Sequence, residues 1–178
     1  MPHLIPIEKI TDIPAKYENT PIEKLLKYHN FRQQGKRYQK AEILLGMCMD
    51  NRKQLCLPDN FAYMIRNGGA DMKYNEFKIS YAIAVGGLSH MALIGHTDCA
   101  MVNLHERKDK FVDGLIRHGG WEKEVATKHF EEMAPQYEIH NEVEFTLKEA
   151  GRLQELYPSL TIVPMLFKLE DRKLYLIE

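Results

Sequence analysis

Two apolar segments, each followed at once by a short polar motif, constrain the fold of this chain most strongly. EILLGM at 42–47 leads into CMDNR at 48–52, and MALI at 91–94 leads into GHTDC at 95–99. Short apolar runs bounded in this way are typical of buried strands. Residues 60–65 predict a further strand between them, and Asn75 opens a predicted helix through EFKISYAIAV that Gly86 and Gly87 end. A right-handed strand–helix–strand crossover places both motifs at the carboxyl edge of a parallel sheet, where open α/β sheets bind ligands.

The flanking segments complete an α/β pattern. Thr20, Pro21 and Glu23 predict an N-cap, a first-turn proline and a capping-box acid ahead of the helix IEKLLKYHNF. Two surface-packed helices are expected at 104–115 and 121–133, and a longer one, EVEFTLKEAGRLQELY, between the cap Asn141 and Pro158. LTIVPMLFKL and KLYLI predict two strands of a hairpin, in which a proline is tolerated mainly at an edge or a bulge.

We therefore predict a central, mostly parallel β-sheet flanked by helices, with an N-terminal helical arm and a C-terminal antiparallel hairpin. The chain has 178 residues and no repeat, low-complexity tract or linker, so we expect residues 1–178 to form a single domain. Residues 1–35 form the arm and first helix in this interpretation.

Composition narrows the possible partners and the compartment. Lysine and arginine number 24 against 25 aspartate and glutamate residues, so no global field attracts nucleic acid or a membrane surface. The N-terminal segment lacks the apolar stretch of a signal peptide, and no run is long enough to span a membrane. Three cysteines without an export signal favour a reducing compartment, and we expect a cytoplasmic protein.

The two motifs supply three good zinc ligands, Cys48, His96 and Cys99. A structural zinc site is normally closed by four protein ligands, whereas a catalytic site leaves one position for water or substrate. Two alternatives stay open at this point. Cys48 alone is compatible with a buried core cysteine, and Cys56 is available to close a structural site of three cysteines and one histidine.

Asp50 and Arg52 lie two and four residues after the first ligand. The carboxylate of Asp50 is close enough to hydrogen-bond a zinc-bound hydroxide, or to coordinate the metal itself. A guanidinium fork from Arg52 would hold that carboxylate bidentately, ionised and off the metal. The alternative is a surface ion pair without a function.

CxDxR, RNGG and GHxxC, followed by a helix and a hairpin, resemble the β-class carbonic anhydrases in order and spacing, most of all the short prokaryotic members. The resemblance runs from about Thr20 to the end of the chain. It implies Zn²⁺ on the three ligands, an Asp50–Arg52 catalytic dyad that orients the hydroxide, and reversible hydration of CO2 to bicarbonate.

The resemblance also implies a substrate pocket near Arg66, Asn67, Gly68 and Ala100. Arg66 and Asn67 are equally compatible with a turn after the second predicted strand. Gly68 is equally compatible with a tight backbone turn that glycine permits. Most members carry glycine at the position of Ala100, whose N–H would donate to substrate and whose methyl would narrow the pocket.

A homodimer or a dimer of dimers is the partner that the resemblance implies. The N-terminal helix would lie across the other subunit, and its apolar residues available for that contact are Ile22, Leu25, Leu26 and Phe31. Some members bind bicarbonate at a second, noncatalytic pocket built on a tryptophan and a glycine. Leu45 and Met47 occupy those positions here, so we predict no such pocket and an active site open at neutral pH.

Three functions remain after these observations. CO2 hydration is the first, and hydrolysis of carbonyl sulfide or carbon disulfide on the same site is the second. The third is a noncatalytic zinc-binding or redox-responsive interaction protein. We expect Asp98 to face solvent or cap a turn, and His90 or His105 are candidates for moving protons.

Overall fold

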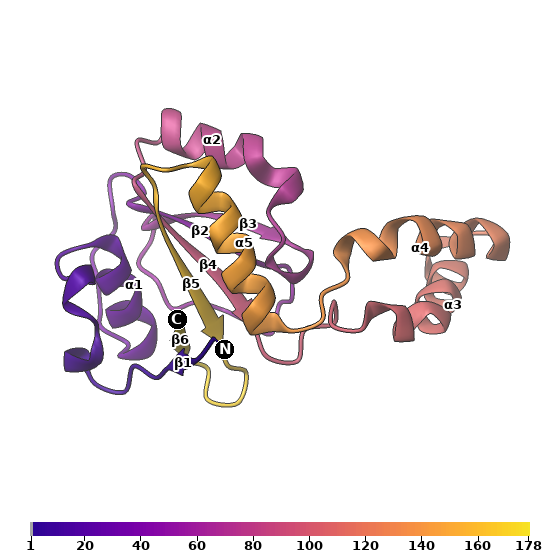
Figure 1. Cartoon of the computed structure of the whole chain (residues 1–178), viewed down its shortest axis with the longest axis horizontal. Coiled ribbons are helices and arrows are strands. Elements are labelled where there is room, and N and C mark those ends of the chain that lie inside the picture. The colour runs from indigo at the N-terminus through magenta and orange to yellow at the C-terminus, as the bar shows by residue number, and fades with distance from the viewer. Residues whose placement is uncertain (1) are drawn as a thin grey trace.

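The computed structural model describes residues 2–178 and contains a six-stranded sheet with helices on both faces (Figure 1). Its strands are β1 (Leu4–Ile5), β2 (Ile43–Cys48), β3 (Ala62–Asn67), β4 (His90–His96), β5 (Thr161–Phe167) and β6 (Leu174–Ile177). They lie in the order β1-β6-β5-β4-β2-β3. β3, β2, β4 and β5 are parallel, and the β5–β6 hairpin and the β1–β6 pair are antiparallel. The predicted fold class is confirmed.

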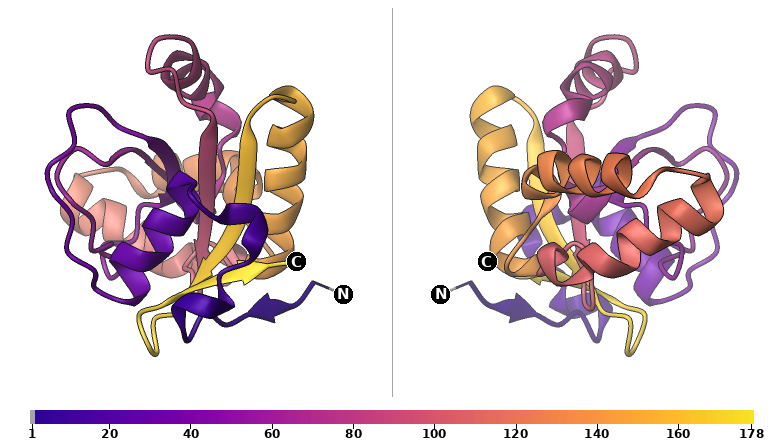
Figure 2. Two further views of the ribbon diagram at one scale, coloured as in Figure 1. Left: turned by 90° about the vertical axis from the view of Figure 1, so that its left-hand side faces the viewer. Right: turned by 90° about the vertical axis from the view of Figure 1, so that its right-hand side faces the viewer.

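Five α-helices accompany the sheet: α1 (Pro21–Asn30), α2 (Glu76–Ala84), α3 (Lys108–Gly119), α4 (Lys123–Tyr137) and α5 (Glu142–Leu156). Short 3-10 turns lie at Ile10–Asp12, Ala15–Tyr17, Gly68–Ala70, Lys73–Asn75 and Leu104–Arg107. Viewed along the sheet, α1 covers one face and α5 the other (Figure 2). The sheet is therefore the middle layer of three.

The apolar runs of the central strands divide between the two faces. Ile43, Leu45 and Met47 of β2 lie in one core cluster with Leu25 and Leu26 of α1. Alternate strand residues point the other way, into a second cluster. That second cluster contains Leu44 and Leu93 from the sheet, Ile79 from α2, and Ala150 and Leu153 from α5. Burial on both faces explains why β2 and β4 are continuous apolar runs and not alternating ones.

Helix capping follows the sequence in one case and departs from it in another. The side chain of Asn141 accepts hydrogen bonds from the amides of Val143 and Glu144, as expected for the cap of α5. Thr20 occupies the N-cap of α1, but its hydroxyl donates to a carbonyl instead of accepting from the helix. The carboxylate of Glu23 accepts from the amide of Asn19, one residue earlier than in a capping box.

Several boundaries differ from the prediction. β3 begins and ends two residues later than expected, so Arg66 and Asn67 belong to the strand and not to a turn. Pro164 lies in β5, an inner strand, and not at an edge of the sheet. It is tolerated because the pairing of β5 with β6 covers only Met165 to Phe167, so no β6 residue pairs with Pro164.

The N-terminal arm corrects a further prediction. β1 was not expected, and it pairs with β6. The side chains of Ile22, Leu25 and Leu26 are fully buried in the core of their own chain, so they are not available to a partner subunit. Phe31 also packs against this core. Any contact of the arm with a second subunit must use other residues.

The segment after the second ligand motif forms a helical hairpin. The helix expected at 104–115 is a 3-10 turn followed by α3, and α4 continues past the expected end at Met133 with Pro135 in its last turn. α3 and α4 stand away from the sheet and pack on each other (Figure 1). Rings of Phe111 and Phe130 lie 5.1 Å apart in that contact. No helix among residues 2–178 is long and apolar enough to cross a membrane.

Candidate metal centre

Three buried side chains converge where β2 and β4 end. Cys48 is the last residue of β2, His96 is the last of β4, and Cys99 follows in the next turn. Because β2 and β4 are adjacent and parallel, their carboxyl ends meet at one edge of the sheet, as the crossover predicts. The ligand atoms of the three residues lie within 4.8 Å of one another.

The donor set fits a zinc ion. The two sulfur atoms are 4.0 Å apart, close to the span of two zinc–sulfur bonds of about 2.3 Å at a tetrahedral angle. Nδ1 of His96 contacts the carbonyl of Thr97 at 2.8 Å, while its Nε2 is buried with no hydrogen-bond partner. Metal-binding histidines characteristically use one ring nitrogen for such a second contact. The three residues can therefore hold a metal ion through two thiolates and one imidazole nitrogen.

The environment of the thiols favours one thiolate even before a metal binds. A hydrogen bond from Cys99 lowers the pKa of Cys48, helped by His96, the amide of Asp50 and the charge of Lys53. The neighbouring Cys48 sulfur, together with burial, raises the pKa of Cys99. A divalent cation is attracted to both thiolates at once, so it would favour deprotonation of both cysteines and not of Cys48 alone.

Arg52 and Asp50 form the bidentate pair that the sequence predicts. Nη2 of Arg52 is 2.6 Å from Oδ2 of Asp50, and Nε is 3.1 Å from Oδ1. The amide of Arg52 also donates to Oδ1 at 2.9 Å. These bonds hold the pKa of Asp50 well below its usual range, against a smaller opposing effect of burial. The carboxylate is thus ionised and committed to the guanidinium.

Asp98 takes part in this arrangement, which the sequence did not suggest. Its carboxylate lies 2.6 Å from Nη1 of Arg52, and its carbonyl accepts from Nη2 at 2.8 Å. The side chain of Asp98 faces solvent, as expected, yet it joins the two ligand motifs through Arg52. Its backbone has a φ of 55°, in the left-handed region that aspartate tolerates better than most residues. The available signal in the sequence was the position of Asp98 between His96 and Cys99.

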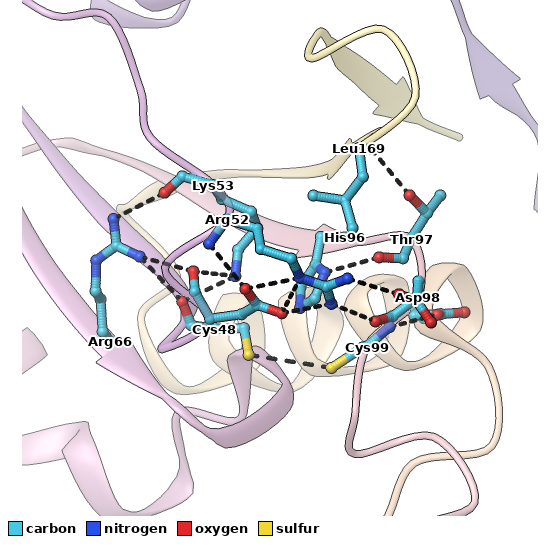
Figure 3. Close-up of polar contacts among 11 residues, drawn as sticks. Cys48, Arg52, Lys53, Arg66, His96, Thr97, Asp98, Cys99 and Leu169 are labelled. Carbon is cyan, nitrogen blue, oxygen red and sulfur yellow. Dashed lines mark hydrogen bonds and ion pairs between the residues drawn. The ribbon is translucent and has the colours of Figure 1, made fainter.

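Two cations that the prediction did not connect with the motif hold its main chain. Nζ of Lys53 donates to the carbonyls of Cys48 at 3.0 Å and Asp50 at 3.2 Å. Nη1 of Arg66 reaches the same two carbonyls at 3.3 and 3.5 Å, and Nη2 donates to the carbonyl of Lys53 (Figure 3). Arg66 is therefore a support of the ligand turn. Lys53, with no exposed surface, was missed because lysine after a charged motif usually indicates solvent.

The second ligand motif is supported from α5. A carboxylate oxygen of Glu142 accepts from the amide of Cys99 at 3.2 Å, a contact that the sequence did not reveal. The strand before His96 also approaches α5 closely. A Cβ at Gly95 would lie 2.3 Å from Oγ1 of Thr146, so glycine is required for this approach.

The remaining predicted pocket residues lie beside the ligands. Asn67 pairs with Cys48 across β2 and β3, and its carbonyl accepts from the amide of Met49 at 2.7 Å. Gly68 is buried, with space for a Cβ limited by Met101. Ala100 follows Cys99 in the sequence and is half-buried. Their contact with substrate stays a prediction.

Cys56 does not join the metal ligands. Its amide donates to Nδ1 of His29, its sulfur contacts Arg32, and its side chain is exposed. The alternative of a closed site with three cysteines is therefore wrong. His90 begins β4, about 20 Å from His96 at about 3.3 Å per residue, and His105 is exposed and paired with Glu138.

No model of a known protein family matches this sequence, and no curated protein matches it either. Solved structures do resemble it. A carbonic anhydrase from Glaciozyma antarctica is 21% identical, with a TM-score of 0.60, over 91% of this chain and 98% of that chain. Beta-carbonic anhydrase isoform I from Trichomonas vaginalis is 15% identical, with a TM-score of 0.60, over 82% of this chain and 87% of that chain.

The apo form of a carbon disulfide hydrolase also has this fold. It is 19% identical, with a TM-score of 0.53, over 90% of each chain. The chain thus has the fold of the β-carbonic anhydrases, over nearly its full length, as the sequence motifs imply.

Proposed function

We propose that this chain is a β-class carbonic anhydrase, which hydrates CO2 reversibly to bicarbonate with a zinc ion held by Cys48, His96 and Cys99. The observation that carries the proposal is the convergence of three buried ligands with an Asp50–Arg52 pair at the same sheet edge. Three protein ligands leave one position of a tetrahedral ion for the reaction. When bound there, zinc supplies a nucleophile at neutral pH by lowering the pKa of a water molecule.

The protein's own groups would prepare this position. Asp50 accepts hydrogen bonds only, because Arg52 keeps it ionised, so it would orient a donor beside the metal. The fork of Arg52 also keeps the carboxylate from becoming a fourth ligand. CO2 hydration has no leaving group to protonate, so we assign no general acid.

A second candidate is hydrolysis of carbon disulfide or carbonyl sulfide on the same site. Its support is the carbon disulfide hydrolase among the structures of this fold, and the linear shape that these molecules share with CO2. Most β-class members carry glycine where this chain has Ala100. The added methyl group beside Cys99 would narrow the pocket and so affect which of these substrates enters. The third candidate, a noncatalytic interaction protein, leaves the Asp50–Arg52 pair without a purpose.

We further propose that the chain is a cytoplasmic homo-oligomer and a single domain. All three cysteines are free, as suits a reducing compartment. Oligomer formation is supported by exposed apolar side chains on α2 and its C-cap: Phe77 is 82% exposed, and Tyr81 and the C-cap Val85 follow at four-residue intervals.

Stopped-flow measurement of CO2 hydration tests the proposal. The zinc-loaded protein should accelerate hydration, and removal of zinc or the substitution Asp50→Asn should lower the rate at least about tenfold. A protein that binds one zinc ion per chain but does not accelerate hydration would contradict the proposal. Headspace assays with carbon disulfide and carbonyl sulfide then test the second candidate on the same preparation.

A further inference from the structure

Lys53 is a buried cation beside the metal ligands. Its side chain has no exposed surface, and its Nζ donates to the carbonyls of Cys48 and Asp50. No carboxylate forms an ion pair with it among residues 2–178. A buried ammonium without a carboxylate partner is costly, and such groups are retained mainly where they serve a site.

The metal centre itself would carry little charge. Thiolates from Cys48 and Cys99 cancel the two positive charges of a zinc ion, and the imidazole of His96 adds none. Such a centre attracts an anion less strongly than a zinc ion held by neutral histidines.

The other charged side chains around the two motifs do not supply the positive charge that the metal centre lacks. Carboxylates outnumber cations among those that hydrogen-bond to or within the motifs: Asp50, Asp98, Glu142 and Glu170 against Arg52, Lys53 and Arg66. Arg52 is occupied by two carboxylates, and Arg66 is exposed, so water screens its charge. Of these three cations, Lys53 is the one that is buried from solvent and has no carboxylate partner in the described chain.

We propose that Lys53 makes the metal centre receptive to anions: its buried ammonium restores one of the two positive charges that the thiolates cancel on a zinc ion. Lys53 is a positioning residue in this account, since it is fully buried against the carbonyls of Cys48 and Asp50 and acts on the ligand site without contacting substrate. The inference rests on the proposed metal site, and it extends the proposed function to the binding of a monovalent anion such as bicarbonate.

Charge, and not hydrogen bonding, is the property that Lys53 contributes. Arg66 donates to the same two carbonyls, so these carbonyls keep a partner when Lys53 is replaced. Lys53→Met removes the charge at similar volume, and Lys53→Gln keeps a hydrogen-bond donor without the charge. Both variants should weaken anion binding to a similar degree.

Azide binding to the cobalt-loaded protein tests the proposal through the visible spectrum of the metal. We expect the azide Kd to rise about tenfold in Lys53→Met and Lys53→Gln, as for the loss of one unit charge at short range in partly dry surroundings. Arg152→Met is the matched control. Arg152 is a partly buried cation that pairs with Glu149 and Glu76 and does not contact either motif. Its substitution should leave the azide Kd unchanged.

Thermal unfolding of the metal-free variants separates this role from a structural one. Because the buried ammonium pairs with no carboxylate of the residues that the structure describes, its replacement leaves no unpaired acid behind, and both variants should unfold close to the wild-type temperature. An azide Kd within twofold of wild type, wild-type azide binding in Lys53→Gln alone, or failure of both variants to fold would overturn the proposal. Failure to take up cobalt would contradict the proposed function as well, whereas Lys53-dependent azide binding without CO2 hydration would contradict the proposed function alone.

Discussion

Arg52 joins the two ligand motifs, because its Nη1 lies 2.6 Å from the carboxylate of Asp98 while its Nε and Nη2 hold the carboxylate of Asp50. A single guanidinium therefore fixes the turn after β2 against the turn after β4. Planar, forked donors suit this task, and an ammonium group does not offer the same two-sided geometry.

Replacement of Arg52 by methionine should release Asp50 toward the metal. We expect the visible spectrum of the cobalt-loaded Arg52→Met protein to report an additional oxygen ligand, and CO2 hydration to fall about 10- to 100-fold. The exposed Arg117 of α3 provides a control, and Arg117→Met should change neither property. An unchanged cobalt spectrum and hydration rate in Arg52→Met would show that the pair is a surface ion pair without a function.

The low pKa of Asp50 predicts a pH dependence of stability. Hydrogen bonds from Arg52 lower this pKa in the folded protein, so the carboxylate stabilises the fold above its unfolded value of about 3.9. That contribution is lost as the pH falls through the folded value. In urea unfolding of metal-free protein, the difference between wild type and Asp50→Asn should be constant above about pH 5 and shrink below about pH 4.

The exposed Asp109 in the first turn of α3 supplies the comparison for this titration. Asp109→Asn should give a smaller stability difference from wild type at neutral pH than Asp50→Asn. A stability difference for Asp50→Asn that grows on acidification would contradict the assignment.

Gly95 sets the distance between β4 and α5. Because a Cβ there would lie 2.3 Å from Oγ1 of Thr146 and 3.3 Å from the carbonyl of Glu142, Gly95→Ala should destabilise the protein by about 1–3 kcal/mol. Thr146→Ala removes the nearest atom, so the double variant should lose less stability than the sum of the two single variants. Chemical denaturation measures this coupling.

Gly114 offers a matched control for the same substitution. It lies inside α3 with no atom near the position of its Cβ, so Gly114→Ala should stabilise the protein by about 0.5–1 kcal/mol. Equal effects of the alanine substitutions at Gly95 and Gly114 would show that close packing against α5 is not what requires glycine before His96.

The exposed apolar surface of α2 predicts self-association. Phe77 and Tyr81 lie on one side of α2, with Val85 at its C-cap, and Tyr63 of the edge strand β3 lies next to Gly86, just after the helix. Sedimentation at micromolar concentration should give a particle of at least twice 20.8 kDa, and Phe77→Asp should shift it toward the monomer. A wild-type monomer of 20.8 kDa would contradict this prediction.

Local sequence patterns predicted the central strands and the cluster of Cys48, His96 and Cys99. β2 and β4 are buried on both faces, so each is a continuous apolar run whose end is marked by the first polar ligand. The parallel arrangement then brings Cys48 and His96 together without further information. Asp50 and Arg52 are two residues apart, so their pairing was also a local inference.

What the sequence did not indicate depends on contacts between distant segments. Burial of Lys53 requires Arg66 of β3 and the turn after Cys48 to close around it, and no local pattern distinguishes it from a surface lysine. β1 exists only because it pairs with β6 at the other end of the chain. Pro164 is accommodated because β6 is short and pairs with β5 only from Met165 to Phe167. The length of β6 cannot be read from the sequence of β5.

Exchange of oxygen-18 between CO2 and water, followed by mass spectrometry, tests the central claim most directly because it reports the interconversion of CO2 and bicarbonate at equilibrium. The zinc-loaded protein should accelerate this exchange, and Cys48→Ser and Asp50→Asn should each reduce it by at least about tenfold. Exchange at the uncatalysed rate by a protein that carries one zinc ion per chain would contradict the account.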